Sequence, residues 1–232
     1  MPIISVDTKK RELVGNFKNP GVRWGSAAKL VNDHDFRSDA IGIAILHGVY
    51  DILANHGHVT IGVSRDTAAF AVASIARWWT EHSASTQSGS REMLLLGDTG
   101  GSNGYRHRAV KTELQNQIAD AFNIKVTVAH YPTGASKWNP IEHRLFSEIS
   151  KNWAGEPLDS YAKILRFIRS TKTKTGLSAS ALPRPSQISH RRHSNSSASR
   201  RTFHQDRRNT AEVELHHIAA LNATVHLFLR RP

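Results

Sequence analysis

Three acidic residues stand at places where a folded chain gathers side chains. Asp7 closes a predicted strand over residues 2–7, Asp98 closes another over 92–98, and Glu142 falls in the first turn of a predicted helix. Open α/β sheets bind ligands beyond their strand ends, so the three carboxylates could converge there. In a chain without cysteine, three carboxylates favour a hard cation such as Mg²⁺ or Mn²⁺. Two such ions about 3.5–4 Å apart can support phosphodiester displacement.

Each of these acids also has an ordinary explanation. An aspartate at a strand end often caps a turn, and a glutamate just after Pro140 interacts favourably with the helix dipole. Other acids could compete. Asp51 or Asp66 would replace Asp7 as the first acid if Asp7 were misassigned, and a loop cluster that turn chemistry explains could supply an accessory site: Asp33, Asp35 and Asp39.

The elements that must position these acids follow from hydrophobic patterning. Apolar runs predict strands over 2–7, 12–17, 43–53, 58–63, 92–98 and 124–129. Helical spacing predicts helices that begin near Asp66-Thr67 and near Pro140, and two more over 106–122 and 157–170. Antiparallel strands followed by alternating helices and strands indicate a ribonuclease-H-like (retroviral-integrase-like) α/β fold, with a mixed sheet flanked by helices.

Composition limits the partners. The net charge of +12 favours a polyanion, most often nucleic acid. No apolar run approaches a membrane span, and no signal peptide is recognisable, so we expect a cytosolic protein without a membrane partner. Fourteen histidines raise the possibility of zinc, but those at 190, 193, 216 and 217 lie in a biased tail without cysteines, so we expect no zinc site.

Four segments together resemble one protein family: residues 4–19, 31–36, 98–104 and 130–153. They are similar to bacterial insertion-sequence transposases of the Rhodopirellula type (Azospirillum-type element), within the DDE superfamily. The resemblance covers about residues 1–176. Its most specific part is residues 137–143, Lys-Trp-Asn-Pro-Ile-Glu-His. The wider mariner-like transposases share the Asn-Pro-Ile-Glu element, whose glutamate completes their catalytic triad.

The resemblance implies that Asp7, Asp98 and Glu142 are the catalytic acids and hold Mg²⁺ (or Mn²⁺), as two ions. It also implies hydrolytic nicking at the ends of a mobile element, followed by attack of a 3′-hydroxyl on target DNA. More weakly, Asn103 would orient a metal ligand or a phosphate. Lys137 and Arg144 would contact DNA phosphates, although a solvated face explains them equally well. The partner is therefore DNA, bound in the bacterial cytoplasm at the nucleoid, with a homo-oligomer forming on it.

The chain divides at residue 176 in composition. Residues 177–232 hold nine arginines, no lysine and three acids, and so carry half of the net charge. We expect a catalytic domain over 1–176 and a largely disordered, Arg/Ser/His-rich tail over 177–232. Compared with the family, the chain looks truncated at its N-terminus and frameshifted at its C-terminus. Alternatives to an active transposase are a catalytically inactive, DNA-binding remnant and a stand-alone ribonuclease-H-like nuclease, the latter disfavoured by the transposase motifs.

Overall fold

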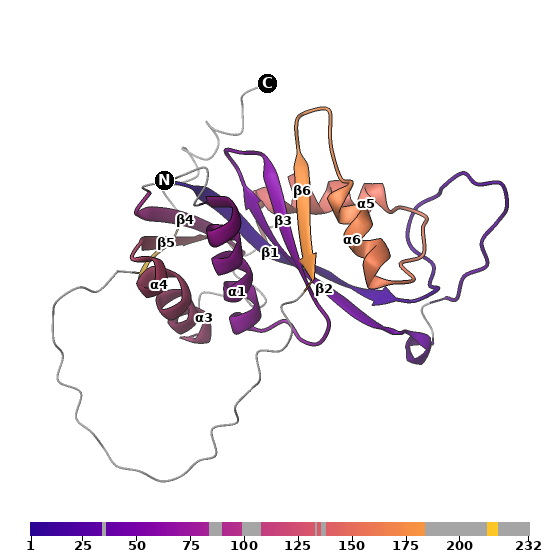
Figure 1. The fold of residues 1–232 in the computed structure, drawn as a ribbon, viewed down its shortest axis with the longest axis horizontal. Helices are drawn as coiled ribbons and strands as arrows, with labels where there is room; N and C mark the ends of the chain where they lie inside the picture. Colours follow the sequence, from indigo (N-terminus) through magenta and orange to yellow (C-terminus); the bar gives the residue numbers. More distant parts are fainter. Residues whose placement is uncertain are drawn as a thin grey trace, which may run out of the picture.

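A central sheet of seven strands, in the order β6-β3-β2-β1-β4-β5-β7, organises the chain (Figure 1). The structure, a computed structural model, describes residues 1–33, 36–83, 90–98, 108–132, 134–135, 138–183 and 213–217. The strands are β1 (Ile3–Val14), β2 (Gly42–Asp51), β3 (His56–Gly62), β4 (Glu92–Gly97), β5 (Lys125–His130), β6 (Ser178–Pro183) and β7 (Val213–His217). β1, β2 and β3 pair antiparallel, whereas β4 and β5 continue from β1 in parallel, so the sheet is mixed.

The helices fall into two groups. The first comprises α1 (Ala68–Trp78), continued by a π-helical turn (Trp79–Ser83), and a helix made of α3 (Arg108–Leu114), a π-helical turn (Gln115–Ala119) and α4 (Asp120–Phe122). The second comprises a π-helical turn (Glu142–Phe146) that continues into α5 (Ser147–Asn152), and α6 (Tyr161–Arg169). A 3₁₀ turn covers Arg37–Asp39. Among the described residues, no helix is long and apolar enough to cross a membrane.

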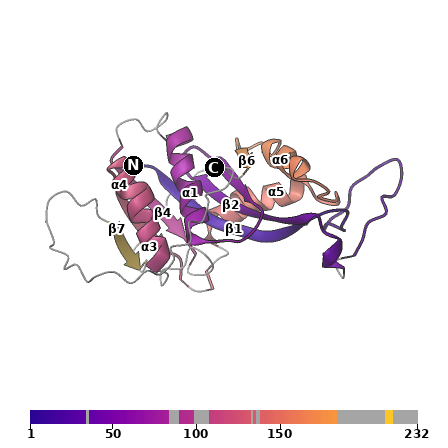
Figure 2. The same cartoon turned by 60° about the horizontal axis from the view of Figure 1, so that its bottom comes forward.

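The two groups of helices bury opposite faces of the sheet. α1 and α3 pack on a cluster that includes Val6, Val49 and Leu95, while the 141–168 segment packs on Leu46, Tyr50 and their neighbours. We call these the α1 face and the α5 face. Figure 2 shows α1, α3 and α4 gathered toward β4 and α5 and α6 toward β6. The order and directions of β1 to β5, with helices on both faces, confirm the ribonuclease-H-like fold.

β1 differs from the sequence prediction. We predicted one strand that ends at Asp7 and another that begins at Glu12, but β1 is continuous and pairs with β2 across both segments. The polar run that resembled a break is strand, because β2 satisfies its backbone hydrogen bonds. A bulge between Lys9 and Glu12 absorbs the change of register.

The sheet also extends past residue 176. β6 pairs in parallel with β3, and β7 pairs in parallel with β5, so two segments of the expected tail belong to the sheet. A structured segment near 213 agrees with the apolar residues there. Residues 184–212 and 218–232 lie outside the described residues, so the expected division into a domain and a disordered tail stays a prediction.

Candidate functional site

Strand register brings Asp7 and Asp98 to neighbouring positions at the end of a ladder. The parallel ladder between β1 and β4 ends at the pair Val6–Gly97; Asp7 is the next residue of β1, and Asp98 directly follows β4. His130, the last residue of β5, pairs with Gly97 from the other side. Asp7 was predicted at a strand end; it lies instead at the end of this ladder, which produces the same convergence.

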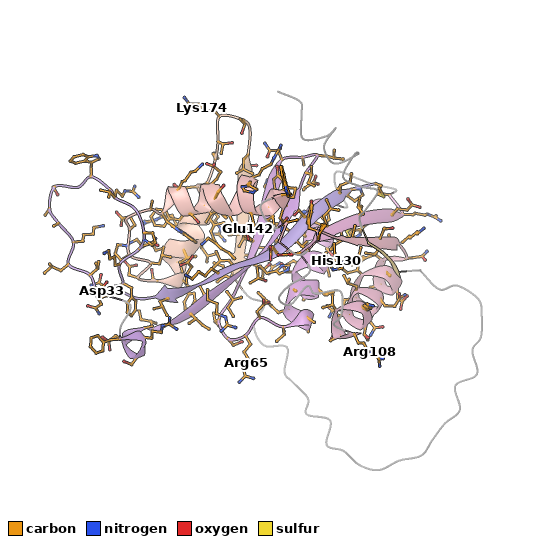
Figure 3. All side chains as sticks on the ribbon, turned by 180° about the vertical axis from the view of Figure 1, so that it is seen from behind. Asp33, Arg65, Arg108, His130, Glu142 and Lys174 are labelled. Carbon is orange, nitrogen blue, oxygen red and sulfur yellow. The ribbon has the colours of Figure 1, made fainter. Side chains whose placement is uncertain are left out.

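The segment 139–146 brings Glu142 toward the end of the β1–β4 ladder. The backbone carbonyl of Asn139 accepts the N–H of Glu142 at 3.2 Å, and Pro140, which has no N–H to leave unpaired, begins the helix as predicted. Ile141, Leu145 and Phe146 are buried on the α5 face. Glu142 is half-buried and lies near the centre of the molecule, where its helical turn contacts β1 (Figure 3).

Two glycines allow that helix to approach the sheet closely. A Cβ on Gly48, the residue opposite Asp7 in β2, would lie 2.8 Å from both Ile141 Cδ1 and the Phe146 ring. A Cβ on Gly57 would overlap Leu145. Close backbone approach is a common reason for glycine within a strand. The two glycines therefore set the height of Glu142 above the sheet.

The three acids interact electrostatically. Burial raises the pKa of Asp7 to about 7; the Thr8 N–H opposes this, and the nearby charges of Glu142, Asp98 and Asp66 add to it. Burial also raises the pKa of Glu142, where Lys9 and His143 act in the opposite direction and Asp98 raises it further. A set of carboxylates that disfavour one another's charge is suited to a cation.

The donor chemistry of the set therefore fits Mg²⁺ or Mn²⁺, which prefer carboxylate oxygens. Within the described part of the chain, however, no three His, Asp or Glu side chains are grouped closely enough to form a ready-made metal site. The loop that follows Asp98 lies outside the described residues. The structure thus brings the acids within electrostatic reach of one another, short of a complete coordination shell.

The remaining predicted residues are distributed as follows. Arg144 is exposed, two residues beyond Glu142, and interacts with the Tyr50 hydroxyl, which lowers a Tyr50 pKa that burial raises. Asn103 and Lys137 lie outside the described residues. Of the alternative acids, Asp51 accepts the N–H groups of its own turn, Asp33 and Asp39 are exposed, Asp35 is not described, and Asp66 is near enough to affect Asp7.

Sequence reasoning missed several neighbours of the site. Ser5, Asp7 and Lys9 alternate along β1 and lie toward the 139–153 segment, where Ser5 bonds Asn139 and the Lys9 ammonium lies 5.1 Å from the centre of the Trp153 ring. Asn139 lies within the Asn-Pro-Ile-Glu element, but the sequence shows only that it is close to Glu142 along the chain. Its partners are more than 130 positions away, so no local pattern reveals them.

Carboxylates at the end of the ladder between two central strands of a ribonuclease-H-like sheet are typical of a class, that of nucleases and transposases of this fold. The family model described as the Rhodopirellula transposase DDE domain matches residues 1–204, and the chain belongs to that family. The match runs past residue 176, where we expected the resemblance to end. No curated protein matched the chain.

Solved structures of similar fold include Mos1 transposase complexes. The paired-end complex with the left transposon end and the pre-cleavage transpososome each give a TM-score of 0.48, at 16% and 15% identity respectively. The Mos1 mariner paired-end complex with Mn gives 0.44 at 16% identity. Each match covers 71% of this chain and 46% of the Mos1 chain, so the likeness spans less than half of those proteins.

Proposed function

We propose that this chain is the catalytic domain of a DNA transposase that hydrolyses phosphodiester bonds at the ends of a mobile element and then joins the freed 3′-hydroxyls to target DNA. The observation that carries the proposal is that Asp7 and Asp98 lie at the end of the β1–β4 ladder and that Glu142 is near enough to affect the pKa of Asp7, in a chain of a DDE transposase family.

In this proposal, Asp7, Asp98 and Glu142 hold two Mg²⁺ or Mn²⁺ ions. When bound, such ions activate the attacking oxygen and stabilise the leaving one. Asp7 would supply one ligand from β1, and because burial and its acidic neighbours raise its pKa, it would release any bound proton as the cation binds. Asp98, directly after β4, and Glu142, on the helical turn that contacts β1, would supply the other carboxylate ligands.

DNA is the proposed substrate. The net charge of +12 favours a polyanion, and the exposed Arg144 projects from the same helical turn as Glu142, where it could contact a phosphate beside the reacting one. Asn103 and Lys137 are weaker candidates for the same role. We further propose that the protein acts in the bacterial cytoplasm at the nucleoid, as an oligomer on paired element ends.

The test is a nicking assay on duplex DNA that carries the element's terminal repeats, with Mg²⁺, Mn²⁺ or EDTA. We expect metal-dependent cleavage that is lost in Asp98→Ala and in Glu142→Ala. Cleavage should be retained in Asp39→Ala, which removes an exposed acid that is not one of the three proposed ligands. Unchanged cleavage in Asp98→Ala or Glu142→Ala would refute the triad. Tight binding to the repeats without cleavage by the wild type would favour the inactive, DNA-binding remnant instead.

A further inference from the structure

Asn139 is a polar residue buried between β1 and the helix that carries Glu142. Its side chain is fully buried, and both ends of its amide are hydrogen-bonded to β1. The Ser5 hydroxyl donates to Asn139 Oδ1 at 2.6 Å, and Asn139 Nδ2 donates to Asp7 Oδ2 at 3.0 Å. The other oxygen of Asp7 accepts the Thr8 N–H at 2.7 Å. Both oxygens of Asp7 therefore have a fixed donor.

We infer that Asn139 is a positioning residue that fixes Asp7 for metal binding and ties it to Glu142. The inference rests on the proposed function, because it concerns the same three acids. Asn139 itself needs no contact with metal or DNA. It acts through Asp7, in the way that neighbours of metal ligands set ligand orientation and affinity.

Charge determines the orientation of the amide. An ionised carboxylate can only accept hydrogen bonds, so the NH₂ of Asn139 must face Asp7 and its carbonyl must face Ser5. With the amide reversed, two acceptors would face one another at Asp7, and the Ser5 hydroxyl would lose its acceptor. Ser5, which is also fully buried, donates to the amide oxygen and so supports the orientation that the charged Asp7 requires.

The backbone of Asn139 makes the second connection. Its carbonyl accepts the Glu142 N–H, so one residue contacts Asp7 through its side chain and Glu142 through its main chain. Pro140 restricts the backbone between them. Loss of the Asn139 side chain would therefore free the first acid, whereas the main-chain bond to the helix that carries the third would remain.

Each Asp7 oxygen has one donor and retains a second lone pair for a cation. With these donors, Asp7 keeps one rotamer and needs less reordering when the ion binds, which is how preorganisation increases affinity. Loss of the Asn139 amide should weaken metal binding even where the protein remains folded. This separates a positioning role from simple filling of space.

The experiment measures Mn²⁺ binding by calorimetry on the full chain without DNA, beside thermal unfolding in EDTA. Asn139→Ala and Asn139→Leu should bind Mn²⁺ about 10–100-fold more weakly than wild type, as for other neighbours of metal ligands. Leucine restores the volume but no donor. Ser5→Ala keeps the donor and loses only its orientation, and should weaken Mn²⁺ binding about threefold. It remains informative if the Asn139 variants fail to fold.

Asn152→Ala is the matched control. Asn152 follows on the same helical segment and donates to the Phe167 carbonyl and to the hydroxyls of Ser170 and Thr171, far from the acids in the hydrogen-bond network. We expect Asn152→Ala to unfold at lower temperature and to bind Mn²⁺ like wild type. A purely structural Asn139 would give the same pattern.

Two results would overturn the inference in different ways. Mn²⁺ binding that is lost in Asp7→Asn but unchanged in Asn139→Leu or Ser5→Ala would overturn the positioning role alone. Mn²⁺ binding that is absent from wild type, or unaffected by Asp7→Asn, would overturn the proposed metal site and, with it, this role.

Discussion

On the α5 face of β2 and β3, apolar side chains from the Glu142 helix meet bare glycines, whereas on the α1 face the same two strands bury polar groups. The α5 face places Ile141, Leu145 and Phe146 against Gly48 and Gly57. The α1 face places His47 edge-on to Phe70 and bonds Thr60 to Ser74 at 2.8 Å. The α1 face is also closely packed, since a Cβ on Gly62 of β3 would lie 2.9 Å from the Phe70 ring. The two faces therefore differ in the polarity of what they bury, and only the packing on the α5 face positions the candidate site.

The largest expected effect tests the packing on the α5 face. In Gly57→Ala the new Cβ overlaps Leu145, and because Leu145 is fully buried its side chain has little room to move. We expect a loss of about 2–3 kcal/mol in the free energy of unfolding, measured with urea, and a matching loss of cleavage as Glu142 is displaced.

Gly25→Ala is the control, because a Cβ there would meet nothing closer than 3.6 Å, and it should change stability by less than about 0.5 kcal/mol. Leu145→Ala added to Gly57→Ala should destabilise less than the sum of the two single changes, since it removes the clashing group. Strict additivity would contradict the proposed contact.

Sequence patterning predicted much of the fold for a physical reason. Strand β4 is largely buried and reads as a continuous apolar run, Met-Leu-Leu-Leu. Thr67 caps α1 through the Phe70 N–H, as predicted. β1 was split because its middle carries polar side chains beside the site. Hydrophobic patterning indicates which side chains are buried. Near a polar site, the backbone can be paired in a sheet although its side chains are polar, so patterning misses the strand there.

For the site, the sequence pointed to the three acids but not to their supports. Asp7 and Asp98 were visible as acids after apolar runs, and Glu142 as an acid after Pro140. The Asn139 contacts span more than 130 positions, and Gly48 and Gly57 carry meaning only once Ile141 and Leu145 lie above them. Such contacts arise from tertiary packing, which hydrophobic periodicity does not encode.

On the α1 face, the expected effect depends on pH. His47 is fully buried, neither ring nitrogen has a partner among the described residues, and burial with a contribution from His58 lowers its pKa to about 3. In the unfolded chain His47 binds a proton near pH 6.5, whereas in the folded chain it stays neutral until the pH is much lower. The free energy of unfolding therefore falls as pH falls from 6.5 toward 3. By pH 5 the loss should reach about 2 kcal/mol.

The measurement is urea unfolding of wild type and His47→Leu at pH 7.5 and pH 5. Asp7 changes stability in the opposite direction over part of this range, so the informative quantity is the difference between the two proteins. That difference should shift in favour of His47→Leu as the pH falls. A difference that is independent of pH would show that His47 can become protonated in the fold.

Asp7 is a charged residue on the otherwise closely packed α5 face, and its removal should stabilise the metal-free protein. Its folded pKa of about 7 lies above the ordinary 3.8, so ionisation becomes a cost as pH rises from 3.8 through 7. At pH 8 in EDTA, Asp7→Asn should raise the free energy of unfolding by about 1–2 kcal/mol, less than full relief because its new NH₂ must face one existing donor.

Asp39→Asn, at an exposed acid, should leave the stability unchanged. Saturating Mn²⁺ should narrow or reverse the gap between Asp7→Asn and wild type, because only wild type retains the ligand. A destabilised Asp7→Asn in EDTA would mean that the carboxylate contributes to the fold without a cation.

The smallest expected effect asks whether the polar groups of the α1 face stabilise it or are merely satisfied there. Ser74→Ala removes the donor to Thr60 and leaves a buried hydroxyl, which should lower the free energy of unfolding by about 1 kcal/mol. Adding Thr60→Val removes the stranded hydroxyl with little change of shape and should recover most of the loss. Urea unfolding of the two single variants and the double variant completes the double-mutant cycle.

Recovery would mean that the α1 face accepts an apolar pair as readily as a polar one, so that its polarity does not hold the sheet together. A double variant as unstable as the sum of its parts would instead give the polar face a structural role comparable to the glycine contacts beneath Glu142.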